Sequence, residues 1–99
     1  MTTLYKTTYF ALNHNGNEEW NTTKYFTRKS LAIEWLKETT EKDARASAKI
    51  YPEFDIYTHL EVFYEEDGTF RYTESGIYSA ITNGGKEIKI YGNMPLFNL

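Results

Sequence analysis

Residues 30–68 read SLAIEWLKETTEKDARASAKIYPEFDIYTHLEVFYEEDG, and the spacing of the apolar side chains changes within this stretch. The first part carries small or apolar residues at intervals of three or four, the period of one helix face: Ile33, Leu36, Thr40, Ala44, Ala48 and Tyr51. Thr27 or Ser30 is suited to cap the first turn. Pro52 ends the helix, because the residue before a proline is pushed away from helical geometry.

The second part of this stretch has the period of a strand. Ile56, Thr58, Leu60, Val62 and Tyr64 alternate with Tyr57, His59, Glu61, Phe63 and Glu65. Alternation places successive side chains on opposite faces of a sheet, and we expect the first set on the core face.

Residues 65–68, Glu-Glu-Asp-Gly, predict a turn after this strand. We expect a three-residue loop with its glycine left-handed, because this register places Tyr64 opposite Phe70 and collects apolar residues on one face. A two-residue Asp-Gly loop would instead place Phe63 opposite Tyr72.

The flanking segments add further strands. Residues 4–10 and 21–26 are β-branched and aromatic, which favours an N-terminal hairpin. Residues 77–81 and 88–91 flank Asn83-Gly84-Gly85, a strong hairpin signal. We therefore expect an α+β fold with a single helix packed on an antiparallel sheet of about five or six strands, in the order β-hairpin, α-helix, β-meander.

Length and composition indicate one domain spanning residues 1–99, with 40% hydrophobic and 17% aromatic side chains. The apolar tail, residues 92–99, should dock on this core, and Trp35 should lie within it. The chain has no cysteine, which favours a reducing compartment. We expect a cytoplasmic protein, since no apolar stretch is typical of a signal peptide or a membrane span.

Charge is uneven along the chain. Residues 52–76 carry seven acidic side chains and a single basic one, Arg71. Carboxylates and aromatic rings on one exposed hairpin are typical of a surface that binds a basic protein. The candidate binding residues are Tyr57, Glu61, Phe63, Glu65, Glu66, Asp67 and Glu74. Tyr78 is expected on the same outer face. The alternative is that these acids only solvate a turn and prevent edge pairing.

Motifs for catalysis are absent from the sequence. It has no P-loop, no dinucleotide-binding glycine pattern, no zinc-protease motif and no thiol nucleophile. His59 with Glu61 is a candidate acid–base pair, and Glu61 and Glu74 are candidates for a second pair that face each other across the hairpin. An exposed polar pair on a two-sided strand is the simpler interpretation. We therefore expect no enzymatic activity, no cofactor and no metal.

These features favour a small acidic binding protein. By analogy of composition, it could be a phage or mobile-element inhibitor that occupies the basic, nucleic-acid-binding surface of a host or defence enzyme. One alternative is a small-molecule, nucleotide-like binder that uses Lys24, Arg28 and Lys29. Another is a self-associating structural protein, a homodimer that pairs through an edge strand, for which the Thr-rich first strand is the candidate, or through the apolar tail. The acidic balance argues against direct binding of nucleic acid.

Overall fold

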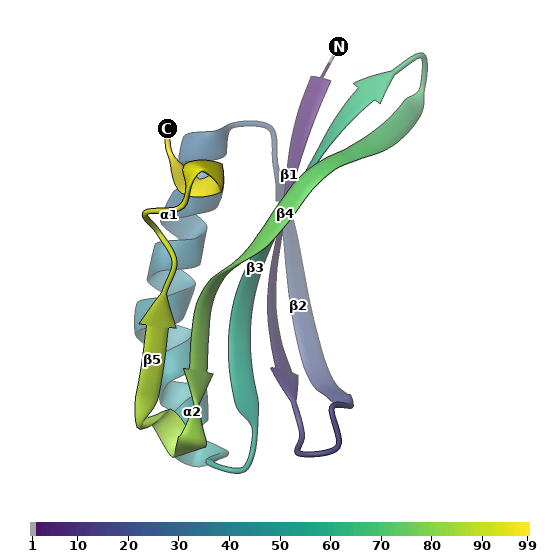
Figure 1. Ribbon diagram of the computed structural model, residues 1–99. Coiled ribbons are helices and arrows are strands. Elements are labelled where there is room, and N and C mark those ends of the chain that lie inside the picture. The colour runs from purple at the N-terminus through teal and green to yellow at the C-terminus, as the bar shows by residue number, and fades with distance from the viewer. Residues whose placement is uncertain (1) are drawn as a thin grey trace.

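The computed structural model describes residues 2–99 and contains a five-stranded antiparallel sheet with a helix packed on one face (Figure 1). The strands are β1 (Thr2–Leu12), β2 (Glu18–Phe26), β3 (Asp55–Glu66), β4 (Thr69–Thr82) and β5 (Glu87–Ile90). Their order in the sheet is β2-β1-β3-β4-β5. The expected fold of hairpin, helix and meander is confirmed. No helix within residues 2–99 has the length and apolar character needed to span a membrane.

One continuous helix connects β2 to β3. Its three segments are α1 (Lys29–Thr39), the π-helical turn η1 (Thr40–Ala44) and α2 (Arg45–Ile50). The residue before its first turn is Arg28, and no side-chain hydrogen bond within residues 2–99 caps that turn. The expected cap by Thr27 or Ser30 is therefore wrong. The helix ends before Pro52, as the sequence predicts.

The helix buries small and apolar side chains against the sheet: Ala32, Ile33, Leu36, Thr39, Thr40, Ala44 and Ala48. Thr39 and Thr40 are neighbours and both are buried, because the wider turn of η1 shifts the buried face by about one residue. Tyr51 is exposed and stacks on Phe54, so its expected place on the buried face is wrong.

Three buried hydroxyl groups join the centre of the helix to the sheet. Thr40 Oγ1 donates to the carbonyl oxygen of Leu36 at 2.7 Å and lies 2.9 Å from Ser79 Oγ. Ser79 Oγ lies in turn 2.6 Å from Thr58 Oγ1. A donor chain from Thr58 through Ser79 and Thr40 to the carbonyl satisfies every hydroxyl proton, so these polar groups are buried without a lost hydrogen bond.

The apolar core has two parts. The first joins α1 to Leu60, Val62 and Tyr78 and includes the tail residues Leu96 and Phe97 from the short helix η3 (Pro95–Phe97). The expected docking of the tail is confirmed. The second part packs small residues of η1 and α2 on larger ones of the sheet: Tyr9, Ala11, Ala44, Ala48, Ile56 and Ile81. Trp35 is half-buried between the two parts, as expected of a core residue.

The turn between β3 and β4 differs from the expected one. Asp67 (φ 53°) and Gly68 (φ 78°) are both left-handed and form a two-residue loop. Phe63 therefore pairs with Tyr72, and the expected pairing of Tyr64 with Phe70 is wrong. No residue from Phe63 to Tyr72 is buried, so burial selects no register, and the preference of Asp-Gly for a two-residue turn decides it.

Two bulges shift the alternation of β4. The first leaves Thr73 without a partner on β3, so Val62 lies opposite Glu74 and Glu61 lies opposite Ser75. Glu61 and Glu74 consequently point to opposite faces of the sheet. The prediction that these two carboxylates face each other is wrong.

The second bulge is at Tyr78. Thr58 pairs with Ser79 and His59 pairs with Ile77, which leaves Tyr78 as the extra residue. Tyr78 is only 5% exposed and packs edge-to-face on Phe97, with ring centroids 5.1 Å apart. Its expected place on the outer face is therefore wrong, because the bulge turns its ring into the core.

Candidate interaction surface

The sheet has one face packed on the helix and one without a packed helix, which we call the open face. Along β3, the buried residues Ile56 to Val62 alternate with Tyr57, His59, Glu61 and Phe63. The β1–β2 hairpin adds its own open-face residues beside them by register: Leu4, Lys6, Thr8, Phe10, Asn21, Thr23 and Tyr25. Three of the predicted site residues, Tyr57, Glu61 and Phe63, thus share one surface.

The aromatic rings on the open face contact each other. Phe10 stacks on Tyr57 with centroids 5.3 Å apart and meets His59 edge-on at 6.5 Å. Burial, with a smaller contribution from Asp55, raises the pKa of Tyr57. The phenol is therefore a neutral hydrogen-bonding group at physiological pH.

Glu61 lies between two basic groups at the centre of this face. Its Oε1 is 3.7 Å from Lys6 Nζ and 3.9 Å from His59 Nδ1. Burial lowers the pKa of His59, Glu61 raises it by a smaller amount, and Lys6 lowers it again. Because the Lys6 ammonium lies beside this carboxylate, Glu61 contributes less negative charge to the surface than its sequence position suggests.

The lowered pKa of His59 predicts a loss of stability in acid. The unfolded chain binds the proton at the ordinary value of 6.5, above the folded pKa, so protonation favours unfolding as the pH falls through that value. We expect the melting temperature to drop more between pH 7.5 and 5.5 in the native chain than in His59→Gln. An equal drop in both proteins, measured by circular dichroism, would contradict this prediction.

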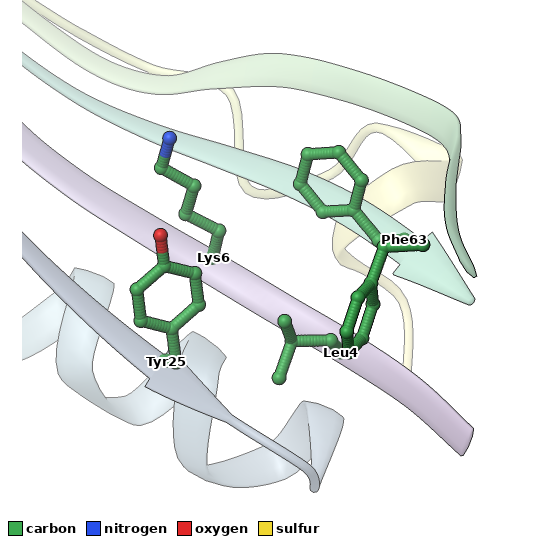
Figure 2. Close-up of a pocket in the computed structure, with 5 residues that line it drawn as sticks. Leu4, Lys6, Tyr25 and Phe63 are labelled. Atoms are coloured by element: carbon green, nitrogen blue, oxygen red, sulfur yellow. The ribbon is translucent and has the colours of Figure 1, made fainter. Parts of the chain in front are cut away.

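A mostly apolar groove of about 430 Å³ lies on the open face, where β1, β2 and the β3–β4 hairpin meet. It is lined by Leu4, Lys6, Tyr25, Phe63 and Phe70. Figure 2 shows Leu4 and Phe63 on one side of the groove, and Lys6 and Tyr25, which carry an amine and a hydroxyl, on the other. The groove can therefore hold an apolar side chain with a hydrogen-bond donor or acceptor at its end.

The β3–β4 hairpin extends past the end of the helix (Figure 1). We call residues 64–75 the hairpin arm, and all of its β4 side is exposed. At its tip, Glu65 Oε1 accepts the Gly68 N–H at 2.9 Å, and Glu66 and Asp67 are exposed. The structure thus gathers these three predicted site residues at one point, away from the core.

The remaining predicted site residue, Glu74, does not lie on the open face with Tyr57, Glu61 and Phe63. Glu74 is exposed on the side opposite Glu61. Sequence reasoning also missed Phe70 and Tyr72, each 57% exposed on the arm. Their exposure follows from the two-residue turn and the length of the arm, which residue type alone does not indicate.

The alternative basic site is less favourable in the structure. Lys24 Nζ lies over the Phe26 ring, 5.5 Å from its centroid. It lines a shallow depression together with Glu34 and Glu38, whose carboxylates offset its charge. Trp20 packs on Tyr51 and Phe54 with centroids 5.3 and 5.7 Å away, which assigns it a local packing contact.

Comparison with protein-family models, with curated proteins and with solved structures finds no significant match to this chain. The interaction surface described above is therefore the basis for any functional inference.

Proposed function

We propose that this chain is a protein-binding module whose hairpin arm contacts a basic surface of its partner. The observation that carries the proposal is the position of the arm: it extends past the helix with Glu65, Glu66 and Asp67 at its tip. A solvated turn needs no such extension, since the core ends before the arm begins. Exposed charge on an extended arm is accessible to a large partner.

The charge of the tip favours a partner of opposite sign. Three consecutive carboxylates create a local negative field that steers a basic protein to this end of the molecule. The field acts over about 8 Å at physiological ionic strength. Binding is therefore expected to weaken as the salt concentration rises.

The groove beside the arm supplies an apolar contact for the same partner. Phe70 belongs to the arm, Phe63 directly precedes it on β3, and Leu4 and Tyr25 complete the wall. A buried apolar anchor ringed by charge is the common arrangement of a protein interface. The partner would insert one apolar side chain into the groove while its basic residues meet the tip.

A basic protein surface of this kind often binds nucleic acid. Carboxylates on a narrow hairpin can occupy positions that phosphates would take, which would make the chain an inhibitor of such a partner. The more specific part of our proposal is therefore that the partner is a nucleic-acid-binding enzyme of a host or of a defence system.

The proposal is tested by neutralising the tip without changing its shape. Glu65→Gln keeps an acceptor for the Gly68 N–H, and Asp67→Asn tolerates the left-handed backbone. The triple variant E65Q/E66Q/D67N should lose a partner that the native chain retains from lysate at low salt. We expect retention to fall about tenfold or more, the effect of losing about 1.4 kcal/mol of attraction.

A matched control carries the same change in net charge elsewhere. E34Q/E38Q/E53Q removes three exposed carboxylates from the helix and the following loop. It should retain the partner like the native chain. If both variants bind equally, the tip is not the contact. A competition with added DNA or RNA tests the more specific part of the proposal. If the nucleic acid fails to displace the chain from its partner, the partner's nucleic-acid site is not the target.

A further inference from the structure

The hairpin arm leaves one edge of the sheet without a neighbour. β5 pairs with β4 only from Ser79 to Thr82. Within residues 2–99, no strand pairs with the outer edge of β4 from Thr69 to Gly76. A free edge presents unpaired N–H and C=O groups, which readily pair with a strand of another chain.

The side chains along this edge are sorted by charge and face. Arg71 pairs with Tyr64, and Glu74 pairs with Val62. Tyr64 and Val62 are two residues apart on β3, so Arg71 and Glu74 share one face. This arrangement depends on the bulge, because without the extra residue three positions of separation would place them on opposite faces.

The other face of the edge is aromatic and polar. Phe70 pairs with Glu65, Tyr72 with Phe63, and Ser75 with Glu61. The Tyr72 hydroxyl lies 2.9 Å from Ser75 Oγ, which agrees with their common face. The rings of Phe70 and Tyr72 are each 57% exposed, so they offer apolar area to an added strand.

We propose that two copies of this chain pair in antiparallel fashion through this edge of β4, with the two-fold axis at Tyr72. Two-fold symmetry places Tyr72 opposite Tyr72 of the partner subunit. The bulge then places Arg71 opposite Glu74 of the partner subunit, and the symmetry repeats this ion pair. Phe70 lies opposite Ser75 of the partner subunit, and the two sheets become one.

The edge fits a second copy because it is complementary to itself. Arg71 is the single basic side chain within residues 52–76. Arg71 and Glu74 lie on either side of Tyr72, and because Thr73 is the extra residue of the bulge, each is one paired position from the two-fold axis. The acidic tips do not oppose this arrangement. Asp67 is five positions from Tyr72, so the two tips lie about 33 Å apart, well beyond the distance over which salt screens charge.

Pairing through the edge goes beyond the proposed binding of a basic partner and does not depend on it. The tip carboxylates stay outside the paired edge, and of the residues that line the open-face groove only Phe70 lies on that edge. E65Q/E66Q/D67N is therefore expected to leave the dimer intact, and loss of self-association need not remove the binding of another protein.

A cysteine placed on the symmetry axis tests the geometry directly. The chain has no cysteine, so Tyr72→Cys introduces the single thiol. Cα atoms of directly opposite residues are about 4.5–5.5 Å apart, within the range that a disulfide spans. Mild oxidation should convert Tyr72→Cys to a covalent dimer. Thr69→Cys, whose two copies would be about 20 Å apart, should stay monomeric. Equal cross-linking of both variants, or none of Tyr72→Cys, would overturn the register.

Charge reversal tests the ion pairs in the chain without cysteine. Arg71→Glu places a glutamate opposite Glu74 of the partner subunit, Glu74→Arg places an arginine opposite Arg71 of the partner subunit, and the symmetry repeats each repulsive contact. Each variant should therefore raise the dimer dissociation constant, measured by sedimentation equilibrium, at least about tenfold. The double variant R71E/E74R restores both pairs and should return the constant to within about threefold of the native value. A native chain that remains monomeric at several hundred micromolar, or single variants that dimerise like the native chain, would refute the proposal.

Discussion

Phe97→Ala is expected to lower the free energy of unfolding by about 3–5 kcal/mol, the cost of removing a buried phenylalanine from a packed core. The Phe97 ring is 4% exposed and meets the Tyr78 ring edge-on at 5.1 Å. It joins the C-terminal tail to the first part of the core, with Leu96 beside it. Its removal leaves a cavity and also loosens the tail.

Thermal and urea unfolding measure this loss. For a domain of this size, we expect the melting temperature of Phe97→Ala to fall by at least about 12 °C. Leu99→Ala is the matched control, because Leu99 is two residues away and 83% exposed. It should change the melting temperature by less than about 3 °C. Similar effects of both substitutions would mean that the tail does not dock as the structure places it.

Leu36→Ala should also destabilise the fold, by about 2–5 kcal/mol. Leu36 is fully buried at the centre of the helix and packs in the first part of the core. Its carbonyl oxygen also accepts the Thr40 hydroxyl, so a shift of the backbone would disturb the buried hydroxyl chain. The cost is expected toward the upper end of this range.

Chemical denaturation separates this effect from a loss of helix propensity. Leu31→Ala makes the same substitution on the same helix at a residue that is 42% exposed. Alanine is the better helix former, so the control should lose no more than about 1 kcal/mol. A difference below about 1 kcal/mol between the two variants would contradict the assigned burial of Leu36.

Self-pairing and partner binding would reinforce each other. A dimer formed through β4 presents two acidic tips about 33 Å apart, one on each side of the two-fold axis. A partner with two basic sites at matching distance would bind both, and the second contact would form at a high effective concentration. The two proposals can still fail separately, since each is tested by substitutions that the other does not involve.

Much of the fold could be predicted because the spacing of apolar residues along the chain indicates which face of each element is buried. The helix period of residues 33–48 and the alternation of residues 56–62 each record which side of an element faces the core. Asn83-Gly84-Gly85 correctly indicated the return of β4 into β5. Local signals sufficed for the helix up to Ala48 and for β3, where the core selects one face and no β-bulge interrupts the period.

In the hairpin arm the predicted register was wrong, since no core lies against it. The predicted register groups Tyr64 with Phe70, as burial would require. The Asp-Gly turn instead imposed its own geometry, and the bulges at Thr73 and Tyr78 changed the alternation twice. A bulge has no reliable signal in a single sequence, because it depends on how both strands twist.

The sequence by itself determined the fold class, the order of the elements and the concentration of acidic residues in one hairpin. Only the tertiary structure decided that Glu61 is shared by Lys6 and His59, that Tyr78 is buried, and that Arg71 and Glu74 lie on one face. The physical reason is the range of the interactions involved. Periodicity and turn preference act between near neighbours, whereas strand register brings together residues that are distant in the chain.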